Sequence, residues 1–165
     1  VAQVMRRFPW TGFMLQWGYR LIQPRFSVGV VGVLLDDAGE RVFLVEHVFH
    51  ARHPWGLPGG WIDRGEDPAR TAEREFYEET GLRVEAGEPV LVMRSPRMRG
   101  HMDIVYRVTL ANGLASDGIG EQVRLSGELF DFRWWSPDDL PPLVKFHERS
   151  IRRVFDRSGS QPENA

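Results

Sequence analysis

Hydrophobic residues occur in short runs separated by turn residues, and the spacing within these runs predicts strands before and after one central helix. The β-branched run from Phe26 to Leu35 predicts a buried strand that ends at the turn Asp36 to Gly39. Arg41 to Val48 predicts a second strand, and the short connection predicts that the two strands form a hairpin. Apolar and polar residues alternate from His101 to Leu110, which is typical of a strand with one buried face.

Shorter apolar runs complete the pattern. Val84 to Glu85 and Val90 to Arg94 predict two short strands, and Phe130 to Trp135 predicts a further one. Residues 112–127 are rich in Gly, Ser and Asp and predict a loop. From Leu143 to Asp156 apolar residues recur at helical spacing, which predicts an amphipathic helix. This order of elements predicts an α/β sandwich with a mixed β-sheet between helices.

The stretch from Gly59 to Leu82 predicts a loop, a helix and a second loop. Asp67 can serve as the N-cap, and Pro68 fits the first helical position because no helical hydrogen bond needs its missing N–H. Gly81 can adopt the left-handed conformation that ends a helix.

Three carboxylates stand on one face of this helix. Glu75, Glu78 and Glu79 occupy positions i, i+3 and i+4, and no lysine or arginine stands on that face. Like charges at this spacing destabilise a helix, so the cluster predicts a cationic partner. Hard oxygen ligands suit Mg²⁺ or Mn²⁺. The alternative interpretation is a solvated acidic helix face.

The residues on either side of these carboxylates favour a metal site over a solvated acidic face. Gly60, Glu66, Arg74 to Glu75 and Glu78 to Leu82 stand at the spacing of the Nudix signature, and over this stretch the chain resembles the Nudix (MutT-like) hydrolases. That family hydrolyses the diphosphate linkage of a nucleoside diphosphate attached to another group. The resemblance implies the same reaction here, the family's α/β/α sandwich, and a divalent cation, Mg²⁺ or Mn²⁺.

The resemblance also implies roles for individual residues. The carboxylates are the expected metal ligands, and one of them is the expected general base. Arg74 is expected to orient a carboxylate of the cluster, and Glu66 to support the loop. The catalytic candidates are Glu75, Glu78 and Arg74, and the metal-ligand candidates are the Gly60 carbonyl, Glu75, Glu78, Glu79 and Glu128.

Glu128 lies just before the predicted strand Phe130 to Trp135, where many relatives carry another acidic ligand or base. Glu121 and Asp131 compete for that role, and a solvated loop acid is the alternative for Glu128.

Candidate substrate-binding residues lie on both sides of the signature. Arg52 and Trp55 precede it and could contact a phosphate and stack on a base. Arg97, Arg99 and His101 follow it and could bind the distal phosphate. For each arginine the alternative is a solvated loop.

Length and composition predict one domain with short extensions. At 165 residues, 42% hydrophobic and 27% charged, the chain has the profile of a single globular domain. We expect an aromatic and basic N-terminal extension over residues 1–24, the hydrolase domain over 25–157 and a flexible tail over 158–165. The N-terminal extension could contact a second copy in a homodimer, pack on the domain, or lie on a membrane surface.

Charge and cysteine content limit the partners. The net charge of -2 predicts no general attraction to nucleic acid, and no apolar run reaches the ~20 residues of a membrane span. The absence of cysteine excludes disulfides and thiolate metal sites and fits a cytoplasmic protein.

The predicted partner is a nucleoside diphosphate-linked small molecule: a nucleotide sugar, an ADP-ribose-like compound, a CDP-alcohol or a nucleoside triphosphate. The alternatives are a non-catalytic nucleotide-sensing domain of the same fold and an RNA 5′-end pyrophosphohydrolase.

Overall fold

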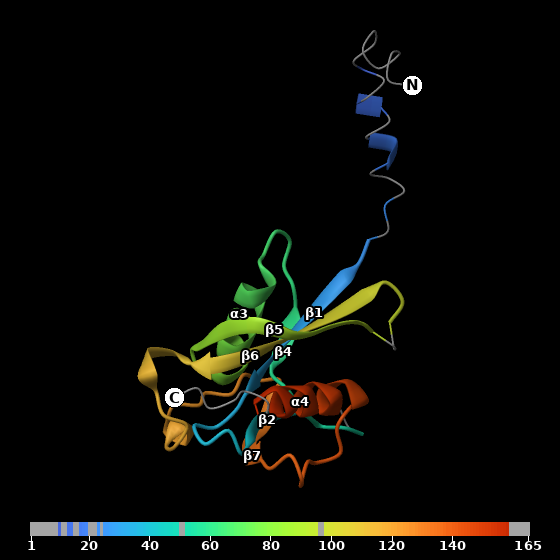
Figure 1. Cartoon of the computed structure of the whole chain (residues 1–165). Coiled ribbons are helices and arrows are strands. Elements are labelled where there is room, and N and C mark those ends of the chain that lie inside the picture. Colours follow the sequence, from blue (N-terminus) through green and yellow to red (C-terminus); the bar gives the residue numbers. More distant parts are fainter. Residues whose placement is uncertain are drawn as a thin grey trace, which may run out of the picture.

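The structure is a computed structural model, and it describes residues 25–49, 52–95 and 98–158 together with residues 10, 13–14, 17–19 and 23. Its strands form two sheets, one of four strands in the order β4-β1-β6-β5 and one of three in the order β3-β2-β7. Two helices, α3 (Pro68–Thr80) and α4 (Lys145–Ser158), pack against them (Figure 1).

The four-stranded sheet is mixed. It contains β1 (Ser27–Leu34), β4 (Gly59–Trp61), β5 (Val84–Arg94) and β6 (His101–Leu110). β1 runs parallel to β6, with Ser27 opposite His101, and antiparallel to β4; β5 and β6 form an antiparallel pair. The three-stranded sheet consists of β2 (Val42–His47), β3 (Trp55–Gly56) and β7 (Leu129–Trp135), and its pairs are antiparallel.

The predicted hairpin between the first two strands is wrong. β1 and β2 belong to different sheets, and a single bridge between Leu35 and Val42 connects their ends. β6 pairs with one edge of β1 along its whole length and β4 pairs with Gly29 to Val31 on the other, whereas β2 pairs with β3 and β7. The Asp36 side chain nevertheless closes the predicted turn, because it accepts hydrogen bonds from the Glu40 and Arg41 N–H groups at 2.7 and 3.1 Å.

The two short strands predicted on either side of Gly87 are parts of one strand, β5. Its register shifts on both sides of Pro89. Because proline has no N–H to donate to the ladder, the irregularity accommodates it without ending the strand. The predicted loop over residues 112–127 contains the short 3-10 helix Ile119–Glu121 and overlaps another, Ala111–Gly113.

The capping signals set the ends of α3. The Asp67 side chain accepts a hydrogen bond from the Ala69 N–H at 2.9 Å, and Pro68 begins the helix. Gly81 ends it with φ 74°, and its N–H donates to the Tyr77 carbonyl at 2.8 Å. Both ends agree with the predicted helix.

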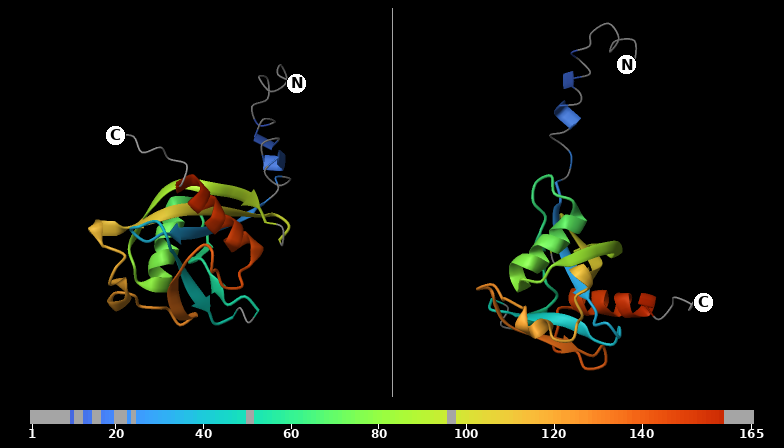
Figure 2. Two further views of the ribbon diagram at one scale, coloured as in Figure 1. Left: turned by 60° about the horizontal axis from the view of Figure 1, so that its bottom comes forward. Right: turned by 90° about the vertical axis from the view of Figure 1, so that its left-hand side faces the viewer.

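Alternating residues of β1 divide the core into two clusters. Val30 and Leu34 pack with Phe76 of α3, and Val33 packs with Ile151 of α4. The two helices therefore cover opposite faces of the four-stranded sheet (Figure 2). This arrangement confirms the predicted α/β sandwich, and β2 and β7 extend both clusters. None of the described helices is long and apolar enough to cross a membrane.

The N-terminal segment is described at few positions. Trp10, Phe13, Met14, Trp17 and Tyr19 are exposed. The remaining residues of the predicted extension 1–24, apart from Gly18 and Gln23, and the tail 159–165 lie outside the described part of the chain.

Candidate functional site

Gly59 and Gly60, the first two residues of β4, bring the segment before α3 against the carboxylates of that helix; this pair is called the Gly59–Gly60 loop. The Gly59 N–H donates a hydrogen bond to Glu79 Oε2 at 3.0 Å. A Cβ at Gly60 would lie 2.4 Å from the carboxylate carbon of Glu75. Only glycine leaves room for Glu75 at this distance. The loop and the helix thus place a backbone segment and two carboxylates in one small volume.

Arg74 links the carboxylates to the loop. Its Nε and Nη2 donate to the two oxygens of Glu66 at 2.9 and 3.0 Å, a bidentate contact. Its Nη1 donates to Glu75 and Glu78 at 2.9 and 3.1 Å, and Nη2 also reaches the Trp61 carbonyl at 3.2 Å. The prediction that no arginine stands on the acidic face is wrong, because Arg74 lies one helical turn before Glu78 and its side chain supplies positive charge to two of the three acids there.

Glu66 supports the loop as the resemblance implied. It accepts hydrogen bonds from the Asp63 N–H at 3.1 Å and the Thr71 hydroxyl at 2.8 Å, in addition to Arg74. The Arg74 guanidinium lowers the pKa of Glu66 to about 2, and the other hydrogen bonds contribute to the decrease. Glu66 is therefore ionised throughout the neutral range.

The two acids nearest the loop, Glu75 and Glu79, have raised pKa values, in contrast to Glu66. Burial raises the pKa of Glu79 to about 8; the Gly59 N–H opposes this increase, and the charges of Glu75, Glu128 and Glu78 add to it. Burial also raises the pKa of Glu75. Burial therefore disfavours the ionised form of both acids, and a bound cation would offset that cost.

We expect Glu79→Gln to change the pH dependence of stability in the absence of divalent cations. The raised pKa means that folded Glu79 keeps a proton that the unfolded chain releases between pH 4.5 and about 8. The free energy of unfolding of the wild type should therefore fall as the pH rises through this window. At pH 9 the glutamine variant should be more stable by on the order of 2–4 kcal/mol, and at pH 4.5 the two should be equal.

Urea unfolding in EDTA at pH 4.5, 7 and 9 measures this difference. Glu85→Gln, at an exposed position of β5, is the matched control and should show no such trend. A constant difference between wild type and Glu79→Gln across the three pH values would contradict the assigned burial of Glu79.

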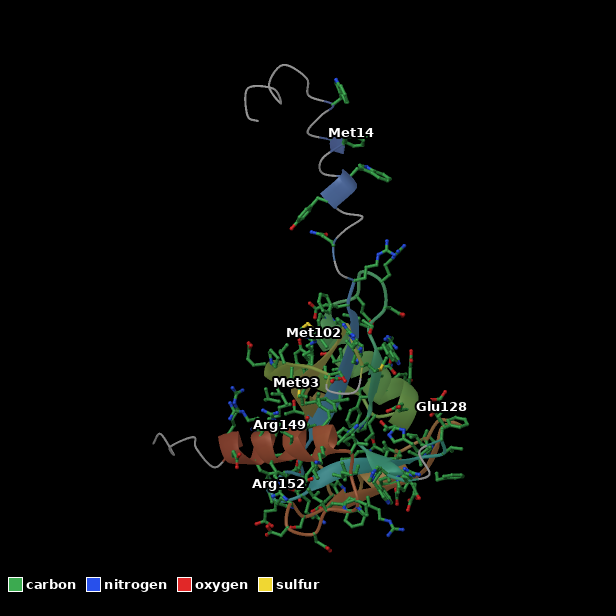
Figure 3. The ribbon with its side chains drawn as sticks, turned by 90° about the vertical axis from the view of Figure 1, so that its right-hand side faces the viewer. Met14, Met93, Met102, Glu128, Arg149 and Arg152 are labelled. Carbon is green, nitrogen blue, oxygen red and sulfur yellow. The ribbon has the colours of Figure 1, made fainter. Side chains whose placement is uncertain are left out.

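The donor set fits a hard divalent cation, although its members are not yet gathered around one point. The oxygens of Glu75 and Glu79 lie against the glycine loop, and Glu128 lies beside α3 (Figure 3). Glu78 is 57% exposed and bonded to Arg74. Within the described ranges, no three His, Asp or Glu side chains converge closely enough to hold an ion. Coordination by Glu78 therefore requires its carboxylate to turn away from Arg74. All the candidate donors are oxygens, which suits Mg²⁺ or Mn²⁺.

The predicted substrate-binding residues are dispersed. Trp55 belongs to β3, where its ring packs edge-on against Trp135 at 5.4 Å. Arg52 is exposed before β3, and Arg99 is exposed in the turn before β6. Arg97 lies outside the described residues.

His101 has a different environment from the one predicted for a phosphate ligand. It is 5% exposed, and its two ring nitrogens lie 2.8 Å from the Ser27 hydroxyl and 3.0 Å from Asp103. Its ring packs against that of Trp61, with the centroids 4.8 Å apart. In this arrangement His101 supports Trp61 and has no nitrogen left for a substrate.

Sequence reasoning missed Trp61. This residue follows Gly60 on the edge strand β4, and its carbonyl accepts a hydrogen bond from Arg74 at 3.2 Å. Its 54% exposed ring packs on His101, on the face of the sheet opposite to the one where Gly60 meets Glu75. A tryptophan directly after the glycine pair was the available signal, but its exposure depends on long-range pairing of β4 with β1.

Comparison with known proteins shows the family to which this fold and site belong. The family model for the NUDIX domain matches residues 25–155, and the chain belongs to the Nudix family. It is a Nudix hydrolase of diphosphate-linked substrates, as the signature predicted.

Three relatives illustrate the range of the family. The chain is 32% identical to a MutT-like protein of Streptomyces ambofaciens, over 71% of this chain and 68% of that protein. It is 31% identical to the CMP-5′-(N-acetyl-N-hydroxy-3-aminopropyl)phosphonate hydrolase of Streptomyces rubellomurinus, over 71% of this chain but only 55% of that enzyme. It is 32% identical to an RNA pyrophosphohydrolase of Dinoroseobacter shibae, over 76% of this chain and 88% of that protein.

Solved structures share the fold. An ADP-ribose pyrophosphatase from Streptococcus suis superposes with a TM-score of 0.65 at 23% identity, over 84% of this chain and 95% of that one. At this identity the likeness supports the fold alone.

Proposed function

We propose that this chain is a cytoplasmic, Mg²⁺-dependent hydrolase that cleaves the diphosphate linkage of a nucleoside diphosphate derivative. The products are a nucleoside monophosphate and a phosphorylated remainder. The observation that carries the proposal is the placement of the Glu75 and Glu79 carboxylates against the Gly59–Gly60 loop, where burial makes their ionised forms costly without a cation. A site built in this way favours a divalent cation, and an anionic diphosphate requires one.

The residues that would hold the ion are the Gly60 carbonyl and Glu75, Glu78, Glu79 and Glu128. When bound, a divalent cation neutralises phosphate oxygens and favours in-line attack by water. Glu75 is our candidate for the general base. Its carboxylate accepts a proton from water while the water oxygen forms a bond to phosphorus and the bond from phosphorus to the bridging oxygen breaks. Glu78 is the alternative base.

Arg74 and Glu66 would keep the base in position. The bidentate contact between them fixes the guanidinium, whose Nη1 then holds one Glu75 oxygen at 2.9 Å. The second Glu75 oxygen can face a water molecule. Orientation of this kind supplies part of the rate enhancement, because it removes the need to order the base in the transition state.

A hydrolysis screen tests the function. The panel contains nucleotide sugars, ADP-ribose, CDP-alcohols, CMP-phosphonates and nucleoside triphosphates, each with Mg²⁺ and with Mn²⁺, and Glu75→Gln serves as the inactive control. Binding of nucleotides without product release from any member would favour the nucleotide-sensing alternative and overturn the enzymatic assignment.

RNA 5′ ends form a second candidate substrate class, supported by the RNA pyrophosphohydrolase relative and by a basic groove. The groove, of about 590 Å³, lies between α4 and β5. Four basic residues line it against two acids, Glu148 and Asp156, and Arg152 pairs with Glu148 at 3.1 Å. Figure 3 shows Arg149 and Arg152 on the side of the molecule away from Glu128. The lining residues are Leu91, Lys145, Glu148, Arg149, Arg152, Arg153 and Asp156.

If the groove binds an RNA backbone, the double variant Arg149→Glu/Arg153→Glu should weaken binding of a 5′-triphosphorylated oligonucleotide about tenfold or more and leave nucleotide hydrolysis unchanged. Wild-type affinity should fall about 20-fold between 50 and 200 mM salt if about three phosphates are neutralised. Gel shifts and fluorescence anisotropy measure both effects. Arg70→Gln, at an exposed position of α3, is the control. Equal affinity in wild type and the double variant would reject this candidate.

A further inference from the structure

The chain passes from one sheet to the other at Leu57 and Pro58. β3 ends at Gly56 in the three-stranded sheet, and β4 begins at Gly59 in the four-stranded sheet. The Pro58 carbonyl accepts a hydrogen bond from the Gly32 N–H at 2.9 Å. Leu57 is 1% exposed, so its N–H needs a partner inside the protein.

That partner is the imidazole of His147, on the first turn of α4. The Leu57 N–H donates to His147 Nδ1 at 2.9 Å. Because a backbone amide can only donate, Nδ1 must carry no proton. Protonation of Nδ1 would set two donors against each other and remove the bond. The ring of Phe146 packs edge-on against the imidazole at 5.3 Å, which limits its movement.

Gly56 gives the imidazole access to this position. A Cβ on Gly56 would lie 3.3 Å from His147 Cε1 and 3.0 Å from Nε2 of His47. His47, at the end of β2, is therefore the titratable group that faces the same point from the neighbouring strand. Gly56 and Leu57 on the intervening segment do not ionise. Two imidazoles thus approach the crossing point, and a charge on either disfavours a charge on the other.

We propose that His147 is a positioning residue for hydrolysis, which holds the crossing at Leu57 and thereby the Gly59–Gly60 loop against α3. This inference rests on the proposed hydrolase function. Besides strand pairing, residues 57–59 have three described anchors: Leu57 to α4, Pro58 to β1 and Gly59 to Glu79. The first connects the candidate active site to α4, on the opposite face of the four-stranded sheet. Protonation of Nδ1 would remove this anchor, which makes the contact sensitive to acid.

Three variants of His147 distinguish the effect of its hydrogen bond to Leu57 from the effect of the size of its ring. Asparagine places its Oδ1 where histidine has Nδ1, so His147→Asn keeps an acceptor that does not titrate. His147→Gln moves the acceptor one bond further, and His147→Leu removes it. We expect His147→Asn to keep kcat within about threefold of wild type at pH 7.5, and the other two to lose about tenfold, because small misplacements of catalytic groups are costly.

The pH profile supplies a readout that a purely structural role would not change. Between pH 7.5 and 5.5 the activity of wild type should fall about tenfold relative to His147→Asn, because only the wild-type acceptor is protonated. His53→Asn is the matched control, since His53 Nδ1 has no hydrogen-bond partner in the described part of the chain; its profile should match that of wild type. Equal activities of His147→Asn and His147→Leu, or a constant ratio of His147→Asn to wild type, would overturn the proposal.

Amide hydrogen exchange at Leu57 tests the anchor without any substrate. Exchange should accelerate at least tenfold in His147→Leu and His147→Gln and stay near the wild-type rate in His147→Asn. Unchanged exchange in all three variants would overturn the proposal. If every variant shows the expected exchange but no substrate is hydrolysed by wild type, the positioning contact stands and the proposed hydrolysis fails.

Discussion

Glu75→Gln should lower kcat by about 10³-fold with little change in stability. The glutamine side chain has nearly the same shape, and its carbonyl oxygen can still accept the Arg74 hydrogen bond that Glu75 receives at 2.9 Å. It cannot accept a proton from water, and general bases contribute about 10²–10⁴-fold. Steady-state hydrolysis of the best substrate from the screen, together with urea unfolding, measures the two effects.

The control for this variant is Glu85→Gln, another glutamate-to-glutamine change in an exposed part of β5. It should leave kcat within about twofold. If Glu75→Gln retains more than a tenth of wild-type activity, Glu75 is not the base, and the same measurement on Glu78→Gln and Glu128→Gln identifies its replacement.

Substitution by alanine should lower stability at Gly59 but lower activity at Gly60. At Gly59, φ is 155° and an added Cβ would lie 2.2 Å from the Val30 carbonyl and 2.7 Å from the Val31 Cα. Both are backbone atoms of the central strand and cannot move aside without breaking its pairing. Gly59→Ala should therefore lower the free energy of unfolding by about 3 kcal/mol or more. Urea unfolding measures the loss.

At Gly60 the obstacle is only the carboxylate of Glu75, the far end of a flexible side chain. Gly60→Ala should leave the free energy of unfolding within about 1 kcal/mol of wild type and lower kcat about 10²-fold, because the displaced carboxylate loses its position. Gly127→Ala, which would meet nothing within 4 Å, is the control for both. A stable Gly59→Ala or a fully active Gly60→Ala would contradict the packing of this loop.

The sequence predicted the elements whose signals are local. Helix α3 begins and ends where Asp67, Pro68 and Gly81 indicate, since capping and proline geometry act within a few residues. β6 has the predicted bounds, because strict alternation reports a strand with one buried face. The helical spacing also predicted that Glu75 and Glu79 share one face, and in the structure both lie beside the Gly59–Gly60 loop.

The predictions that failed concern features set by which strands pair with each other. The hairpin was wrong because turn residues indicate that the chain reverses but not whether a third strand takes the free edge. The exposure of Trp61 and the burial of His101 both follow from pairing with β1. The contact of His147 with Leu57 spans 90 residues and leaves no local pattern to read.

The parallel pairing of β1 with β6 also bears on how the chain reaches this fold. Ser27 and His101 are 74 positions apart, so β1, an inner strand of the larger sheet, cannot pair with β6 until residues 101–110 have been synthesised. Contacts of such long range slow the search for the native topology, because a large loop must close before they form. During translation β1, apolar along most of its length, therefore remains unpaired on this edge while the whole Nudix motif is being made. In that interval its unpaired apolar edge is open to aggregation.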